Sequence, residues 1–267
     1  MQQSPEELKR KSIWMRKANL AKCKSSGRKD LDKLVWQQTL EECDAGWMHG
    51  PYDEGQISCM VGSSDWLATR RFPLEQKDKT RLIDDALASG LNSAYGTSNK
   101  LTLFDIDTLV AMVLQAARAM QQKSGTITTS VYVSVSALWS QPLQLVGRTL
   151  DLQSAYKQVG PCMTDLWNRI IMVYDPEGDC TKYFVSSALM FGSTAAVYAF
   201  NRISRSLWHI LSSLLSLWMT VYYDDFPMVE PCETAGSAEL CMAEILDLLG
   251  WKFARSGHKA PPFASVF

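Results

Sequence analysis

Two adjacent carboxylates are the residues whose type and spacing most directly suggest chemistry. Asp224 and Asp225 lie between short runs of β-branched and aromatic residues, so the stretch 218–230 predicts two strands joined at the Asp pair. Such a pair is most often a solvated turn. A third carboxylate, Asp151, follows an extended apolar segment. Carboxylates gathered at neighbouring strand ends repel one another unless cations bind them, and two divalent ions about 4 Å apart are the machinery of nucleotidyl transfer.

The composition is that of an ordinary globular chain. Of 267 residues, 46% are hydrophobic and 21% charged. The net charge of −1 excludes a globally basic nucleic-acid-binding protein but is compatible with a local basic groove. Seven scattered cysteines without a C-x-x-C motif argue against zinc and favour a reducing, intracellular compartment. The polar start predicts no secretory signal. The apolar run 206–223 contains His209 and several serines, so we expect a buried helix and no membrane span.

The first part of the chain predicts helices and a cationic hairpin. Residues 5–29 form a basic helical pattern, typical of a solvated face but able to contact a phosphate backbone, and residues 30–45 predict a second helix. Residues 66–74 and 80–84 predict a hairpin with Lys79 near its tip and Arg81 close by. That tip is either simply solvated or a cationic finger over a triphosphate.

The rest of the chain alternates helical and extended patterns. Gly192 precedes a long predicted helix that ends near Leu217, and a glycine there would let the backbone approach a ligand closely. We expect an amphipathic helix over 105–123 whose apolar stripe is core, and a strand over 126–135. A hairpin is expected from 168–175 and 181–186. Near the end of the chain we expect a helix over 234–249, with Leu240, Ile245 and Leu249 inward, and a short strand over 251–254.

The order of these features resembles the fingers and palm of reverse transcriptases. The resemblance depends on three blocks: Asp-Leu-Gln-Ser-Ala-Tyr-Lys-Gln at 151–158, Phe-Gly-Ser at 191–193 and Tyr-Tyr-Asp-Asp-Phe at 222–226. More narrowly, the chain is similar to retroelements of the DIRS type and to related dinoflagellate sequences. The resemblance covers roughly residues 34–262.

The resemblance implies roles for the carboxylates. Asp151 and Asp224 match the two metal-binding carboxylates of the family, and Asp225 matches the second Asp of the turn. The carbonyl of Leu152 would complete the metal shell, which implies two Mg²⁺ ions, with Mn²⁺ as a substitute. Lys259 matches the late lysine that protonates the leaving pyrophosphate; a solvated turn lysine is the alternative.

The resemblance also implies a nucleotide pocket. Tyr156 matches the aromatic residue that screens the sugar 2′ position, which favours deoxynucleotides. Phe191 and Gly192 match the segment that lines the nascent base pair, and either Lys79 or Arg81 would clamp the triphosphate. The implied partners are an RNA or DNA primer-template and deoxynucleoside triphosphates.

The expected fold is α+β, with a small antiparallel palm sheet backed by helices and with fingers above it. We assign residues 1–59 to a helical N-terminal extension, 60–140 to the fingers and 141–267 to the palm, with a fingers insertion at about 165–188. Only eight residues follow Lys259, so we expect the thumb to be lacking and further C-terminal domains to belong to a longer polyprotein.

Three positions depart from the family pattern. Ala86 and Leu87 replace the aromatic and small polar residues expected there, and Met190 stands where proline usually precedes Phe-Gly. These departures keep a second hypothesis open, a truncated or degenerate palm that binds nucleic acid without polymerising. A third hypothesis, an RNA-directed RNA polymerase, is disfavoured by Tyr156.

Overall fold

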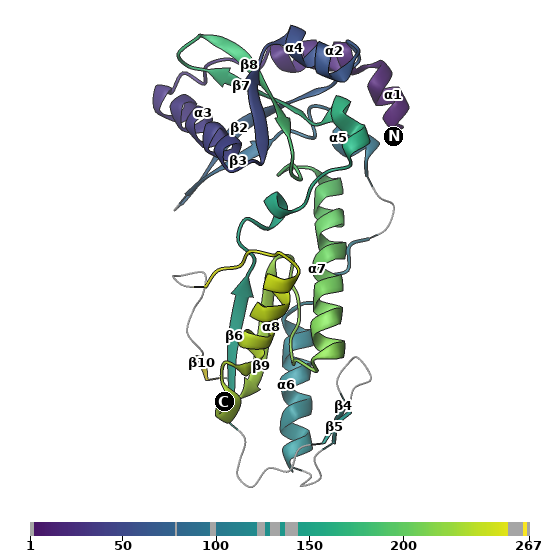
Figure 1. Cartoon of the computed structure of the whole chain (residues 1–267), viewed down its shortest axis with the longest axis vertical. Helices are drawn as coiled ribbons and strands as arrows, with labels where there is room; N and C mark the ends of the chain where they lie inside the picture. Colours follow the sequence, from purple (N-terminus) through teal and green to yellow (C-terminus); the bar gives the residue numbers. More distant parts are fainter. Residues whose placement is uncertain are drawn as a thin grey trace. The chain divides into compact units, whose positions relative to one another are not determined.

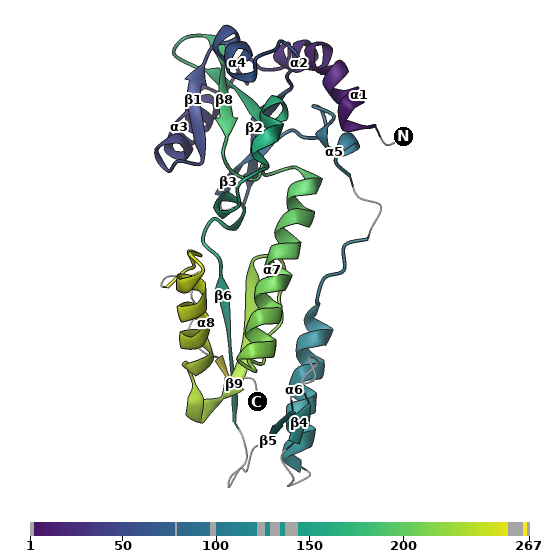
Figure 2. The same cartoon turned by 45° about the vertical axis from the view of Figure 1, so that its right-hand side comes forward.

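The chain divides into two compact units. The structure, a computed structural model, describes residues 3–77, 79–96, 100–121, 126–128, 134–136, 144–255 and 264–265. The first unit comprises residues 1–100 and 156–198, and the second comprises residues 101–155 and 199–267. Figures 1 and 2 show the helices and strands of each unit.

A five-stranded mixed sheet forms the centre of the first unit (Figure 1). Its strand order is β1-β8-β7-β2-β3, in which two antiparallel hairpins are joined by a parallel pairing of β2 with β7. Both hairpins agree with the strands predicted from sequence. The strands are β1 (Met48–Tyr52), β2 (Ala68–Gln76), β3 (Lys79–Asp84), β7 (Ile170–Asp175) and β8 (Cys180–Ser186).

Residues 1–59, assigned from sequence to a helical N-terminal extension, contribute both helices and one strand to this unit. Strand β1 pairs antiparallel with β8, so Met48 lies opposite Ser186 and the early chain supplies a strand of the sheet. The two paired segments are far apart in the chain, so no local sequence pattern predicts that β1 pairs with β8. The fingers and palm bounds drawn from sequence stay a prediction.

The helices of the first unit follow local sequence signals. Helix α4 begins at a capping box, in which the Asp53 main-chain N–H donates to the Gln56 side chain at 2.8 Å. Ser4 caps the first helix through the main-chain N–H of Glu7. The helices are α1 (Pro5–Arg10), α2 (Ser12–Leu20), α3 (Lys29–Asp44), α4 (Glu54–Val61) and α5 (Leu91–Ala94), with 3-10 turns η1 (Ala155–Gln158) and η2 (Met163–Asn168).

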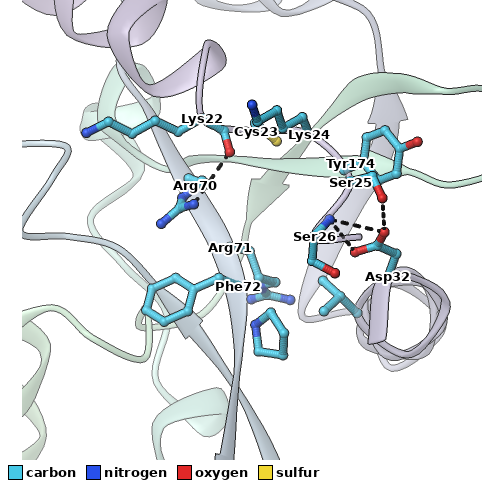
Figure 3. A pocket seen from close by; sticks show the side chains of 12 residues that line it. Lys22, Cys23, Lys24, Ser25, Ser26, Asp32, Arg70, Arg71, Phe72 and Tyr174 are labelled. Carbon is cyan, nitrogen blue, oxygen red and sulfur yellow. Dashed lines mark hydrogen bonds between the residues drawn. The ribbon is translucent and has the colours of Figure 1, made fainter. Parts of the chain in front are cut away.

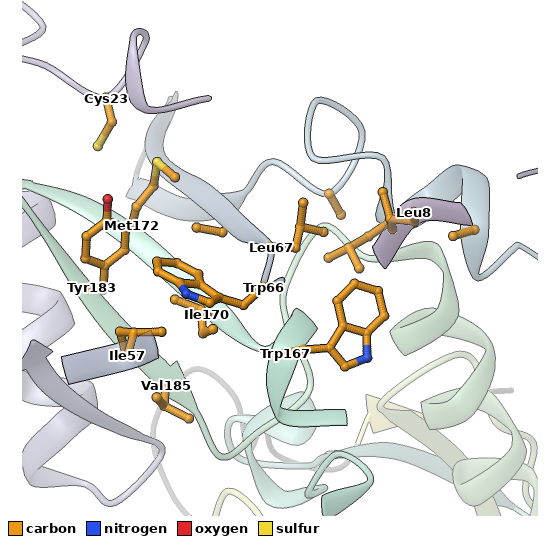
Figure 4. Packing of buried hydrophobic residues seen from close by; sticks show 14 residues of the cluster. Leu8, Cys23, Ile57, Trp66, Leu67, Trp167, Ile170, Met172, Tyr183 and Val185 are labelled. Carbon is orange, nitrogen blue, oxygen red and sulfur yellow. The ribbon is translucent and has the colours of Figure 1, made fainter. Parts of the chain in front are cut away.

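The main core of the first unit lies between its sheet and its N-terminal helices. Trp66 is fully buried and its ring meets that of Tyr183 edge-on, with 5.2 Å between centroids. Leu8 of α1 and Ile57 of α4 pack into the same cluster as Ile170 of β7, as Figure 4 shows. Burying side chains of this size is worth about 1.5–3 kcal/mol each, so the N-terminal helices are integral to the unit.

A smaller sheet backed by helices forms the second unit. Strand β6 (Leu145–Asp151) lies between β9 (Asp225–Pro231) and β10 (Ala264–Ser265), and all pairings are antiparallel. Val113, Leu145 and Val229 are buried together. The helices are α6 (Ile106–Gln121), α7 (Thr194–Leu214), which begins in the first unit, and α8 (Ser237–Leu248), with a 3-10 turn η3 (Cys232–Thr234).

Strand β9 is joined to α8 by a buried acid. The Glu230 carboxylate accepts hydrogen bonds from the main-chain N–H of Gly236 at 2.9 Å, the Ser237 hydroxyl at 3.1 Å and the main-chain N–H of Ala238 at 3.3 Å. These donors lie at the start of the helix, where N–H groups lack helical partners and a negative charge is favoured. Glu230 therefore fixes where α8 begins.

The buried face of α8 differs from the one expected. Its buried residues are Ala238, Met242 and Leu246. Leu240 and Leu249 are exposed, and Ile245 is half-buried. The helix is apolar on most sides, so the sequence did not single out the face that packs.

The apolar stripe of α6 was expected to be core throughout, and this was wrong. Val113 is buried, whereas Ile106, Val110 and Leu114 are exposed. Helical periodicity shows that such a helix is amphipathic, but it does not show how much of the stripe finds a packing partner.

The strand expected over 126–135 takes a different form. The structure has two short strands there, β4 (Thr126–Thr128) and β5 (Ser134–Ser136), which pair antiparallel with each other. The residues between them lie outside the described part of the chain. Within the described residues, no helix is long and apolar enough to cross a membrane.

The fold is α+β, with a small antiparallel sheet backed by helices, as in a polymerase palm.

Candidate active site

Two of the predicted carboxylates lie directly opposite each other in the second unit. The register of β6 and β9 pairs Asp151 with Asp225, next to the buried pair Leu150 and Phe226. Opposite residues of an antiparallel pair point their side chains to the same face, with Cβ atoms about 4.5–5.5 Å apart. The last residue of one strand and the first of the next therefore present their carboxylates together at one end of the sheet.

The third carboxylate, Asp224, lies in the tight turn before β9. Tyr222 and Asp225 exchange two main-chain hydrogen bonds, of 2.9 and 3.0 Å, so Tyr223 and Asp224 are the two turn residues. Tyr223 has a φ of +54°, in the left-handed region that an aromatic residue rarely adopts. The predicted turn is confirmed in position, but Asp225 belongs to the strand, and the segment before the turn forms only isolated bridges at Met219 and Tyr222.

Main-chain bonds hold Asp151 and Leu152 from both sides. The Leu152 N–H donates to the Asp224 carbonyl at 3.2 Å, and the Ala254 N–H donates to the Asp151 carbonyl at 2.9 Å. Leu152 also bridges Phe253, where a short strand was expected. These bonds hold the main chain at Leu152 between the Asp224 turn and the segment around Phe253.

The donor chemistry of this end of the sheet suits a hard divalent cation. Carboxylate and carbonyl oxygens are the ligands that Mg²⁺ and Mn²⁺ prefer, and Asp151, Asp224, Asp225 and Leu152 supply them. Across the residues that the structure describes, however, no group of three or more His, Cys, Asp or Glu side chains is placed to hold a metal ion. The oxygen ligands are of the type that the cation prefers, but the three carboxylates do not converge into a complete coordination site.

The predicted nucleotide-pocket residues lie in the first unit, and three of them are in contact. The rings of Tyr156 and Phe191 meet edge-on at 6.0 Å between centroids. The guanidinium carbon of Arg81 lies 5.9 Å from the centroid of the Phe191 ring. Lys79 and Arg81 are both exposed and lie two apart on β3, so they share one face of the strand. Arg81 thus contacts Phe191, one ring of the aromatic pair.

Gly192 has a structural reason to be glycine. Its φ is +121°, and a Cβ atom there would lie 2.3 Å from the main-chain oxygen of Asp84. The carbonyl of the preceding residue, Phe191, accepts a hydrogen bond from the Asp84 N–H at 2.8 Å. The glycine thus lets the Phe191 segment pack against the end of β3, a role the sequence did not indicate. Lys259 lies outside the described residues.

Sequence reasoning missed a buried ion network beside these residues. Arg71 on β2 is almost fully buried. Its guanidinium binds both carboxylate oxygens of Asp84, with 2.8 Å between Nε and Oδ1. It also binds Glu42 of α3, with 2.8 Å between Nη1 and Oε2. The same Glu42 oxygen accepts from Lys157 Nζ at 2.8 Å. The only signal in the sequence is a pair of arginines inside an otherwise strand-like segment.

The charges of this network stabilise one another. Burial alone would raise the pKa of Glu42, but the nearby charges of Arg71 and Lys157 outweigh it, so the pKa lies below its usual 4.5. Burial likewise acts against the charge of Arg71, yet Asp84 and Glu42 raise its pKa above the ordinary value. A buried arginine between two carboxylates is costly to disrupt, because the loss of one partner leaves an uncompensated charge.

A separate hollow of about 260 Å³ lies on the first unit (Figure 3). It is lined by the α2–α3 connection, including Lys22 and Lys24, and by Arg70 and Phe72 of β2. Asp32 lies in its wall and accepts hydrogen bonds from the Ser25 hydroxyl and the Ser26 N–H. The hollow contains none of the predicted site residues.

Comparison with known proteins supports the fold. No family model matches the sequence, and no curated protein matches it. Among solved structures, a foamy viral protease-reverse transcriptase in complex with double-stranded DNA superposes with a TM-score of 0.55 at 15% sequence identity. The match covers 83% of this chain and 30% of that one. The chain therefore has a reverse-transcriptase-like fold and spans less than a third of that neighbour.

Proposed function

We propose that this chain is the fingers and palm of an RNA-directed DNA polymerase of a retroelement, similar to the DIRS and dinoflagellate sequences. The observation that carries the proposal is the register that sets Asp151 opposite Asp225, with Asp224 in the adjoining turn. The motif order in the sequence and the fold shared with a reverse transcriptase support it. The substrates are deoxynucleoside triphosphates and an RNA or DNA primer-template.

Each group has a role in this proposal. Asp151 and Asp224, with Asp225 beside them, would bind the cations that hold a primer 3′-hydroxyl and a triphosphate. Two Mg²⁺ ions, or Mn²⁺ in their place, would supply the acidity and charge neutralisation for an in-line displacement. Arg81 or Lys79 would bind triphosphate oxygens, and Lys259 would donate a proton to pyrophosphate. Positioning and charge neutralisation then provide most of the catalysis.

Tyr156 would select the sugar. Its ring rests edge-on against Phe191, and an aromatic ring held next to the sugar excludes a 2′-hydroxyl by steric clash. This favours deoxynucleotides over ribonucleotides and disfavours an RNA-directed RNA polymerase.

The decisive experiment is primer extension on an RNA template with Mg²⁺ or Mn²⁺. Asp224→Asn should reduce extension by at least about 100-fold, since charge at the reacting centre is worth several kcal/mol. The matched control is Asp107→Asn, because Asp107 is an exposed carboxylate at the start of α6 in the same unit. Extension by Asp224→Asn at the parent rate would refute the assignment.

A degenerate palm is the second candidate function. It is favoured by the departures at Ala86, which is buried, and Leu87, which is 75% exposed where the family pattern has a small polar residue. A degenerate palm would bind primer-template duplex in a gel-shift or anisotropy assay, with or without divalent cations, and would extend no primer. Extension by the parent protein would exclude it.

A further inference from the structure

The N-terminal helix α3 reaches the predicted sugar-selecting residue through a closed cycle of contacts. Starting from Glu42, the cycle runs through Arg71 to Asp84 by salt bridges. The Asp84 N–H then donates to the Phe191 carbonyl at 2.8 Å, and the Phe191 ring abuts Tyr156.

The cycle closes through the residue after Tyr156. Lys157 Nζ donates to Glu42 Oε2 at 2.8 Å, and its side chain is only 13% exposed. A further main-chain bond, from the Leu189 N–H to the Val159 carbonyl at 2.9 Å, ties the segment of Tyr156 to the segment of Phe191. Every member lies in the first unit.

We propose that Glu42 is a positioning residue for sugar selection: by holding Lys157 and Arg71 at one oxygen, it fixes Tyr156 against Phe191. The inference rests on the proposed polymerase function and deepens it. One carboxylate oxygen with two cationic partners joins the strand carrying Arg71 to the 3-10 turn that carries Tyr156. Without it, Arg71 keeps Asp84 as a partner, whereas Lys157 loses its salt bridge.

The physical requirement is steric. A ring that excludes a hydroxyl group must be held to within about 0.5 Å, and that precision comes from supporting contacts around the functional side chain. Lys157 is adjacent to Tyr156 in η1, a 3-10 turn of only four residues. A short turn of this kind has little regular structure of its own, so its position depends on side-chain ties such as the one to Glu42.

The test compares Glu42→Gln and Lys157→Gln with Glu41→Gln. Glu41 is the exposed neighbour of Glu42 on the same helix, so it controls for the loss of one carboxylate. The measured quantity is the ratio of kcat/KM for a deoxynucleotide to that for the matching ribonucleotide. We expect the ratio to fall about tenfold in both test variants, as for the loss of about 1.4 kcal/mol of discrimination, and to stay unchanged in the control.

Selectivity separates positioning from mere stability. A variant that only loses folded protein loses deoxynucleotide and ribonucleotide incorporation equally, and the ratio does not move. Lys157→Arg keeps the charge and should retain most of the ratio. The double variant Glu42→Gln/Lys157→Gln should be no less selective than the single variants, because the same tie is removed. Unchanged selectivity in Lys157→Gln would overturn the inference.

A second readout does not need catalysis. Amide exchange of residues 155–159 and 189–191, followed by mass spectrometry, should quicken in both test variants and not in Glu41→Gln. If the parent extends no primer but the exchange pattern is as expected, the proposed function fails while the positioning contact stands. If exchange in these segments is unchanged in Glu42→Gln, the positioning inference fails whatever the activity.

Discussion

Replacing Gly192 with alanine should destabilise the first unit by two separable effects. The first is backbone strain, because the φ of +121° lies in a region that residues with a side chain rarely adopt. The second is overpacking, because the new Cβ would lie 2.3 Å from the Asp84 main-chain oxygen. That oxygen belongs to backbone at the end of β3, so it cannot swing aside as the tip of a side chain would.

The two effects can be told apart with Gly62. Gly62 also has a positive φ, of +71°, but a Cβ there would meet nothing within 4 Å. Gly62→Ala should therefore show strain alone, on the order of 1 kcal/mol. Gly192→Ala should add an overpacking cost of about 1–3 kcal/mol.

The assay is native-state amide exchange of β2 and β3, which report the stability of the first unit. We expect the free energy of opening to fall by about 1 kcal/mol in Gly62→Ala and by about 2–4 kcal/mol in Gly192→Ala, from the same strain and overpacking terms. Equal losses in the two variants would refute the argument that contact with Asp84 is why position 192 is glycine.

Two more predictions concern stability. Burial, with a smaller contribution from the charge of Glu54, raises the pKa of Tyr183 to about 12. The neutral phenol is therefore favoured in the folded state, so its contribution to stability is complete below the ordinary pKa of 10 and is lost as the pH rises toward 12. Tyr183→Phe should remove this part of the alkaline destabilisation. The measurement is the free energy of unfolding by urea at a pH below and a pH above the ordinary pKa of 10, and an equal loss in parent and variant would contradict the prediction. Glu230→Ala should cost about 1–3 kcal/mol, since it leaves three donors at the start of α8 without their acceptor; exchange at residues 236–238 should quicken, and unchanged protection would count against the capping role.

Much of the local structure could be predicted because its signals are local. Alternating and β-branched residues indicated the β2–β3 and β7–β8 hairpins. The turn before Asp225 was also readable from the residues around it, although only the segment after it forms a full strand. Periodicity was less informative on α8, because apolar residues lie on most of its sides and the packing partner, not the helix, decides which face is buried.

The sequence by itself determined the residue types of the site and their order, because the identities and positions of its carboxylates, aromatic residue and glycine can be read directly along the chain. Only the tertiary structure decided which of them meet. The strand register sets Asp151 opposite Asp225, the end of β3 explains Gly192, and a buried ion network brings Glu42 to Lys157 across 115 positions of the chain. Contacts at such separation follow from packing and charge pairing in the folded chain, which no local pattern specifies.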